Sequence, residues 1–216
     1  DLALEAARSA DRPLLFGLRE DEDWAFAEQL ELLRPGDVVT HSFHGFEDGV
    51  LEGSGAVVEG MKDAQSRGVV IDLGHGAGGF SFKAAEKALA NGVVPDTVST
   101  DIHTTSIKGP VYDFATTITK LMHLGMSLEE VMRRSTETPA RVMRLGDRLG
   151  TLKVGAEGDV TVLKVEEGRF KLVDRLSPAT KLGSTNWEPG ITVEASKKLV
   201  HVHTVKAGAV YRPWLK

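Results

Sequence analysis

Three polar side chains follow successive apolar segments in the first half of the chain. His41 ends the segment VVT, His75 follows IDLG, and Asp101 ends VST. If these segments are parallel strands of one sheet, the three side chains share the edge at which α/β proteins build their active sites. Imidazole and carboxylate groups together are ligands of a hard or borderline divalent metal. The pattern therefore predicts a metal-assisted site.

Each of these residues also has a structural interpretation. A lone histidine after an apolar strand is more often a hydrogen-bonded structural residue than a ligand. Asp101 is harder to explain in this way, because a carboxylate at the tip of a buried strand is costly unless something pairs with it.

The surrounding segments alternate between strand and helix patterns. Apolar runs at 13–18, 36–43, 69–76 and 97–100 predict strands, and segments with helical spacing separate them. This alternation predicts parallel strands with right-handed helical crossovers. The predicted helices cover 2–10, 21–33, 55–68, 81–92 and 111–125.

Two more helices and a β region complete the chain. Ser127 and Glu130 form a capping-box pattern, and Thr138 followed by Pro139 predicts the start of a second helix. The apolar period then changes to two, with turns at glycines. We therefore expect an α/β domain over 1–148 and a small β region over 149–216.

Composition limits the possible functions. The 216-residue chain has a net charge of −5 and no cysteine, so disulfides and thiolate metal sites are excluded. It has no basic run typical of nucleic-acid binding, no apolar run of the ~20 residues that a membrane span needs, and no signal-peptide pattern. We therefore expect a cytoplasmic protein without nucleic-acid or membrane partners. The chain begins with Asp1 inside a helical pattern, which suggests a fragment or a processed product.

Four longer motifs resemble a known family. They are LRPGDVVTHSFHG, DLGHGAGGFSFKAAEKAL, PDTVSTDIHT and TPARVMRLGDRLGTLKVGAEGDVTVL. Together they resemble the amidohydrolase superfamily, in particular its dihydroorotase-like N-acyl deacetylases. The resemblance covers nearly the whole chain.

The resemblance implies a fold and a reaction. The implied fold is a partial (β/α)8 TIM-type barrel, its last four strands, followed by a small β-sandwich region. The implied cofactor is one or two zinc ions, with His41 and Asp101 as ligands and with His75 and His103 contacting the substrate. Asp101 would pass a proton from the zinc-bound water to the leaving amine. The implied substrate is a small N-acyl amino or hydroxy acid, or a cyclic amide.

Two departures from the family pattern concern the metal site. Gly17 stands where the fifth strand of the family carries a metal-binding histidine. The family's His-x-His pair and carboxylated lysine belong to strands that this sequence lacks, and a whole barrel needs ~250 residues. We therefore expect a homo-oligomer or a missing N-terminal half. The alternative function is that of a catalytically inactive relative, acting as a structural or binding module. A flavodoxin-like protein without metal ranks last.

Other polar residues have structural interpretations. His201 and His203 are interpreted as an exposed strand face and not as a metal pair. His44 is interpreted as lining a pocket near His41. Asp72 is interpreted as orienting a neighbouring group or capping a loop, with no catalytic role.

Overall fold

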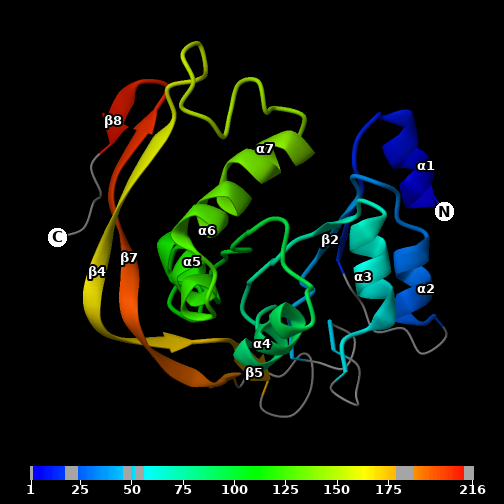
Figure 1. The fold of residues 1–216 in the computed structure, drawn as a ribbon, viewed down its shortest axis with the longest axis horizontal. Helices are drawn as coiled ribbons and strands as arrows, with labels where there is room; N and C mark the ends of the chain where they lie inside the picture. The colour runs from blue at the N-terminus through cyan, green and yellow to red at the C-terminus, as the bar shows by residue number, and fades with distance from the viewer. Residues whose placement is uncertain (1, 18–23, 46–49, 52–55, 179–186, 212–216) are drawn as a thin grey trace.

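The computed structural model describes residues 2–17, 24–45, 50–51, 56–178 and 187–211. These residues form a small parallel sheet with helices around it and a long antiparallel ribbon beside them (Figure 1). None of the described helices is long and apolar enough to cross a lipid bilayer.

The parallel sheet contains three of the four predicted strands. Its order is β1 (Leu15–Gly17), β2 (Val38–Thr40) and β3 (Val70–Ile71). The fourth segment, 97–100, forms one parallel bridge, from Asp72 to Thr97. Backbone N–H groups of residues 73, 75 and 76 nevertheless donate to carbonyls of residues 97, 99 and 100, so this segment runs beside the end of β3.

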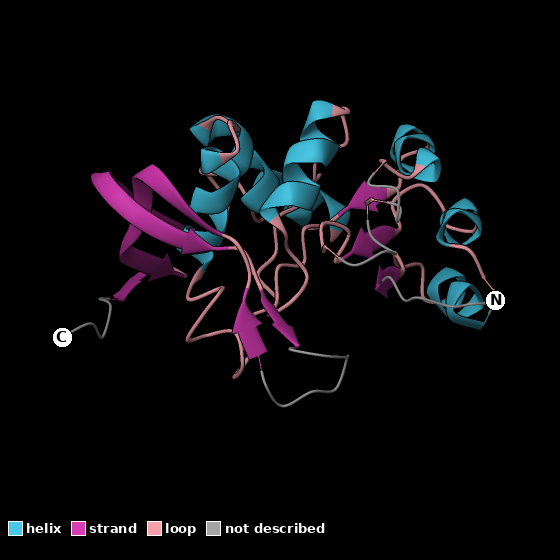
Figure 2. Cartoon of the chain, turned by 90° about the horizontal axis from the view of Figure 1, so that it is seen from below, coloured by secondary structure: helices cyan, strands magenta, loops and turns pink. Residues whose placement is uncertain are grey.

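The predicted helices between the strands are present, with shorter bounds. Ser81 caps one by accepting from the Ala84 N–H, and Asp113 caps another by accepting from the Thr116 N–H. In Figure 2 the helices form an outer arc around the parallel strands. They are α1 (Leu2–Ser9), α2 (Phe26–Glu31), α3 (Glu59–Ser66), α4 (Phe82–Ala90) and α5 (Phe114–His123). Residue 18 of the first predicted strand, residues 21–23 of the second predicted helix and residue 55 of the third lie outside the described residues.

The next two helices follow each other directly. Helix α6 (Leu128–Ser135) has the predicted capping box between Ser127 and Glu130. Helix α7 (Glu137–Val142) begins two residues earlier than Thr138 and Pro139 predicted. The prediction was wrong because Thr136 is both the C-cap of α6 and the N-cap of α7. The two helices therefore have no loop between them for a separate capping residue.

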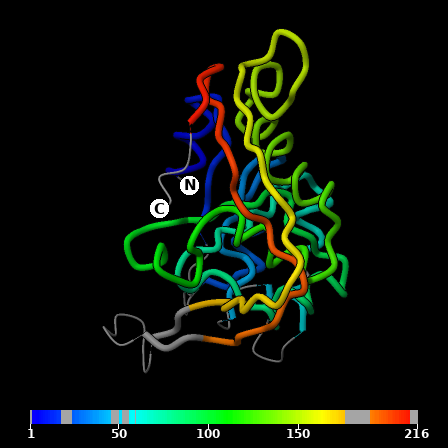
Figure 3. Tube along the Cα trace, turned by 90° about the vertical axis from the view of Figure 1, so that its left-hand side faces the viewer, coloured from blue at the N-terminus to red at the C-terminus, as the bar shows by residue number. Residues whose placement is uncertain are grey.

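The C-terminal region is antiparallel, as its period of two predicts. Strands β4 (Val160–Val173) and β7 (Thr192–Lys206) pair along nearly their whole length, as Figure 3 shows, and β8 (Ala209–Tyr211) extends this sheet. A separate pair consists of β5 (Leu176–Pro178) and β6 (Trp187–Pro189).

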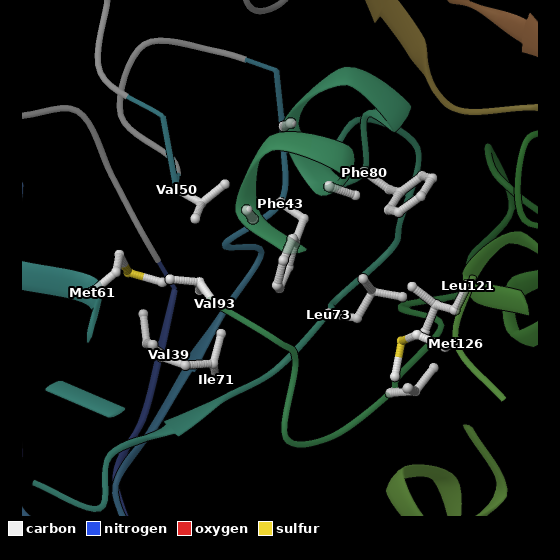
Figure 4. Close-up of a cluster of buried hydrophobic side chains, with 14 of the residues drawn as sticks. Val39, Phe43, Val50, Met61, Ile71, Leu73, Phe80, Val93, Leu121 and Met126 are labelled. Carbon is white, nitrogen blue, oxygen red and sulfur yellow. The ribbon is translucent and has the colours of Figure 1, made fainter. Parts of the chain in front are cut away.

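The hydrophobic core runs from the parallel strands to the helices that cover them. Val39 and Ile71 from the strands, with Phe80 before α4 and Leu121 from α5, are fully or almost fully buried (Figure 4). Leu199 of β7 belongs to the same cluster, so the ribbon shares this core. The core therefore fixes the strand ends relative to α4 and α5.

Candidate active site

His41 and Asp101 lie together at the carboxyl edge of the parallel sheet. His41 directly follows β2, and Asp101 directly follows the segment 97–100. The His41 Nε2 atom is 3.9 Å from the Asp101 Oδ2 atom, and the two side chains are 35% and 49% exposed. The structure thus brings together the two residues expected to bind metal and leaves both accessible.

A backbone carbonyl fixes the orientation of the His41 ring. The His41 Nδ1 atom is 2.6 Å from the carbonyl oxygen of Gly74. Because a carbonyl can only accept, Nδ1 carries a proton, and any lone pair of the ring is on Nε2, the atom nearest Asp101. Metal-binding histidines are typically oriented by such a bond from the other ring nitrogen.

The backbone around this pair is tightly constrained. His41 and Asp101 both have positive φ angles, of 61° and 42°, in the left-handed region that non-glycine residues rarely adopt. Gly74 and Gly76 have φ angles of +53° and +48°. A Cβ atom at Gly74 would collide with the side chain of Thr40, and one at Gly76 would lie 2.5 Å from Asp101 Oδ2. The close approach to both candidate side chains therefore requires glycine.

His75, the third predicted residue, faces the core. It is fully buried, it stacks on Phe80 at 5.0 Å between ring centroids, and its Nδ1 atom lies 2.8 Å from the Gly76 carbonyl oxygen. Its Nε2 atom lies 2.7 Å from Lys120 Nζ. Burial and the nearby Lys120 charge lower the pKa of His75 to about 3. Both nitrogens have protein partners, so the expected substrate contact stays a prediction that would require the ring to exchange one of them.

Gly17 lies beside His41. It is opposite Thr40 in the β1–β2 register, and a Cβ atom added to it would lie 3.9 Å from His41 Cδ2. The position at which the family's histidine is absent is therefore open and lies directly next to the His41 imidazole. Within the described part of the chain, no group of three or more His, Asp or Glu side chains is arranged to hold a metal ion. The His41–Asp101 pair provides two donors of the types that zinc prefers.

Comparison with known proteins identifies the family. Residues 81–208 match the model of the amidohydrolase family. The chain belongs to this family. It is 38% identical over 157 residues to a deacetylase of Agrobacterium fabrum, and this match covers 73% of this chain and 38% of the relative. It is 34% identical over 189 residues to a deacetylase of Enterococcus faecalis, which covers 85% of this chain and 47% of the relative.

Solved structures show the same relationship. The amidohydrolase chain is similar to an adenine deaminase, with a TM-score of 0.87 and 31% identity over 98% of this chain and 54% of that chain. It is also similar to a dihydroorotase, with a TM-score of 0.80 and 32% identity over 98% of this chain and 52% of the other. The chain thus spans about half the length of these proteins or less.

Lys120 is a buried polar residue of this amidohydrolase chain that no sequence motif marks. Its side chain is fully buried on α5, and its Nζ atom donates to the Pro110 carbonyl oxygen at 2.9 Å as well as contacting His75. Burial lowers its pKa to about 7, although the Asp174 and Asp113 charges act in the opposite direction. A lysine within a buried helical run was the available signal, but lysine stems often cross apolar surface to reach water.

His103 and His44 occupy different environments near the site. His103 is exposed in the loop after Asp101, where its Nδ1 atom accepts from the Thr105 N–H at 3.3 Å. His44 is buried, and burial, followed by the charges of His41 and Arg175, lowers its pKa to about 4. The pocket position of His103 stays a prediction, because its contacts here are with residues of its own loop.

The two histidines of β7 are separated by a β-bulge. The register shifts between Val162 and Leu163, which pair with His203 and His201. His201 is half-buried, lies 2.8 Å from Thr204 Oγ1, and lines a cleft of about 940 Å³ between α5–α7 and the β4–β7 ribbon. The interpretation of both as an exposed face was therefore wrong for His201, because the bulge changes the alternation. Neither His41 nor Asp101 lines this cleft.

Proposed function

We propose that this amidohydrolase chain is the C-terminal half of a metal-dependent hydrolase that cleaves an amide bond. The observation that carries the proposal is the fixed His41 ring, whose Nδ1 bond to Gly74 leaves the Nε2 lone pair facing Asp101 at 3.9 Å. The parallel order β1-β2-β3 and the similarity to longer solved chains support the last four strands of a (β/α)8 barrel with a small β-sandwich region.

Zinc is the proposed cofactor, because imidazole and carboxylate are among its usual ligands and the chain has no cysteine. His41 Nε2 and the Asp101 carboxylate would hold the ion. The ion would supply Lewis-acid chemistry, activating water and polarising the amide carbonyl. Further ligands would come from a segment equivalent to the part of the relatives that this chain does not cover, or from a second copy of the chain.

Asp101 is the proposed general base and acid. It is about half exposed, so a reacting water can reach its oxygen atoms. Asp101 would accept the proton of the attacking water and deliver it to the nitrogen of the leaving amine, a role in which carboxylates contribute about 10²–10⁴-fold in rate. His75 and His103 are kept as proposed substrate contacts, His103 from the exposed loop after Asp101.

The proposed substrate is a small N-acyl amino or hydroxy acid, with a cyclic amide as the second choice. The curated proteins with similar sequences are named deacetylases, which favours an N-acyl group. A cytoplasmic location, with no nucleic-acid or membrane partner, remains part of the proposal.

Two measurements test this function. Elemental analysis of protein purified without chelator is expected to give about one or two zinc ions per complete site. Asp101→Asn is expected to lower the rate of hydrolysis of N-acetyl amino acids by at least ~10²-fold. The circular dichroism spectrum of this variant is expected to be unchanged. Normal turnover by this folded variant would contradict the role of Asp101.

An inactive relative is the second candidate, and Gly17 beside His41 favours it. Such a chain would act as a structural or binding module, with a homodimer covering the exposed edge of β1. Essentially no zinc together with a dimer in light scattering would support this candidate. Stoichiometric zinc in a monomer would argue against it.

A further inference from the structure

The carboxylate of Asp72 forms a buried hydrogen-bond centre beneath the candidate site. Asp72 follows β3 and is 6% exposed. Its Oδ2 atom accepts from Thr40 Oγ1 and from Ser99 Oγ, and its Oδ1 atom accepts from Thr97 Oγ1, each at 2.6 Å. None of the ion pairs among the described residues includes Asp72. Three hydroxyl groups from two neighbouring segments therefore satisfy this carboxylate.

Two of these three hydroxyl groups belong to residues that lead into the candidate ligands. Thr40 directly precedes His41, and Ser99 lies two residues before Asp101. Both ligands have positive φ angles, and such backbone persists only where the surroundings fix it. A carboxylate that holds the residues just before both ligands provides this restraint.

Ser99 also connects Asp72 to the orientation of the His41 ring. The Ser99 hydroxyl donates to Asp72 and accepts from the Gly74 N–H at 3.2 Å. The carbonyl of the same Gly74 accepts from His41 Nδ1. Hydrogen bonds on both sides of the Gly74 Cα atom therefore link Asp72, through Ser99, to the ring of His41.

We propose that Asp72 is a positioning residue, which holds Thr40 and Ser99 so that His41 Nε2 and the Asp101 carboxylate face each other. Among the described residues, the side-chain hydrogen bonds of Asp72 go to hydroxyl groups and not to either ligand side chain, so Asp72 acts through its hydroxyl partners. Its effect on zinc rests on the proposed function, whereas its effect on the His41 ring does not. Hydrogen-bond partners of metal ligands commonly change metal affinity by 10- to 100-fold when they are removed.

Thr40 and Thr97 provide a matched pair of test sites. Both are buried, and each donates one hydrogen bond of 2.6 Å to Asp72. Only Thr40 adjoins a candidate ligand. Replacement by valine removes either hydroxyl with almost no change in shape, so a merely structural carboxylate would make T40V and T97V equivalent. A positioning carboxylate would make them different.

The experiment uses the full chain with Asp72→Asn, Thr40→Val and Thr97→Val, and it has two readouts. The first is ¹⁵N NMR of the His41 ring in the metal-free chain at mildly alkaline pH, where the two neutral tautomers are distinguished. The second is Zn²⁺ affinity by competition with a chromophoric chelator. We expect the Nδ1–H tautomer in the unmodified chain and in T97V, mixed tautomers in D72N and T40V, and 10- to 100-fold weaker zinc binding in D72N and T40V alone.

Equal effects of T40V and T97V on the ring would overturn the proposal, and so would an unchanged His41 spectrum in D72N. If D72N does not fold, the two threonine variants still decide between the outcomes. If the unmodified chain binds no Zn²⁺ while the tautomers change as expected, the positioning role stands and the zinc-dependent function fails.

Discussion

The Nζ atom of Lys120 lies 2.7 Å from the Nε2 atom of His75, and both side chains are fully buried. The ring donates from Nδ1 to the Gly76 carbonyl, so Nε2 is free to accept from the amine. A neutral amine has two N–H groups, which suffice for His75 and for the carbonyl of Pro110. The pair therefore joins α5 to residues 75 and 76, which lie next to Asp101, without requiring a buried charge.

This pair predicts a pH dependence of stability. The pKa of Lys120 is about 7 in the folded chain, against an ordinary value of 10.5. Between these pH values the unfolded chain binds more protons, so the free energy of unfolding should rise as pH increases from about 7 to about 10.5. Lys120→Met should remove this rise, which is on the order of a few kcal/mol. Urea unfolding at a series of pH values measures it.

Lys164→Met is the control, because Lys164 is exposed on β4. It should keep the rise with pH. If the free energy of unfolding rises with pH equally in the unmodified chain and in Lys120→Met, Lys120 is not the group that causes the rise.

The close approach of Gly76 to Asp101 provides a steric test of the His41–Asp101 pair. Gly76→Ala should weaken zinc binding and stability together, because its Cβ would lie 2.5 Å from Asp101 Oδ2 at a φ of +48°. Gly92 also has a positive φ, of +81°, but a Cβ there meets nothing within 4 Å. Gly92→Ala should therefore cost only the backbone strain of about 1–2 kcal/mol and leave zinc binding intact. Zinc competition with urea unfolding separates the two effects, and equal zinc affinities would refute the steric argument.

Two buried threonines of α5 predict different stability changes. Thr119 Oγ1 accepts from the Leu199 N–H of β7 at 2.9 Å. Thr119→Val should cost about 1–3 kcal/mol, because it leaves this buried donor unsatisfied. Thr116 Oγ1 is also buried but finds no hydrogen-bond partner among the described residues, so Thr116→Val should be neutral or stabilising. Thermal and urea unfolding of the two variants test this contrast, and similar losses in both would contradict it.

Gly17 predicts a gain of metal binding. A side chain at this position extends beside His41, where the nearest atom to a new Cβ is His41 Cδ2 at 3.9 Å. Gly17→His should strengthen Zn²⁺ binding by about tenfold or more, because it adds an imidazole donor next to the existing pair. Gly17→Leu adds bulk without a donor and should give no gain. Isothermal titration with Zn²⁺ compares them, and equal affinities would place residue 17 away from the metal.

The sequence predicted local structure wherever one segment contained the whole signal. The capping box of Ser127 and Glu130 was identified because its whole signal lies within four residues. The start of α7 was mispredicted because Thr136 serves two helices, a feature of how α6 meets α7. The family could likewise be identified from contiguous motifs, and the match over 81–208 confirms it.

For residues in distant segments, the sequence predicted only that they share an edge of the sheet, and not which atoms are in contact. The order of the strands placed His41 and Asp101 at one edge, but it could not show that the Gly74 carbonyl fixes the His41 ring. The same holds for Asp72, whose hydroxyl partners lie 25 to 32 residues away, and for Lys120, which is 45 residues from His75.

The sequence by itself determined the alternation of strands and helices, the antiparallel C-terminal region, the capping box of α6 and the family, because periodicity and short motifs are local properties. The tertiary structure alone decided which polar side chains are buried and which atoms they face. In the folded chain, the His75 side chain is buried in the core and the Asp101 side chain is exposed to solvent. The Asp72 carboxylate accepts hydrogen bonds from three hydroxyl groups. The physical reason is that hydrogen bonds depend on the positions of atoms within a few ångströms, and packing between distant segments sets those positions.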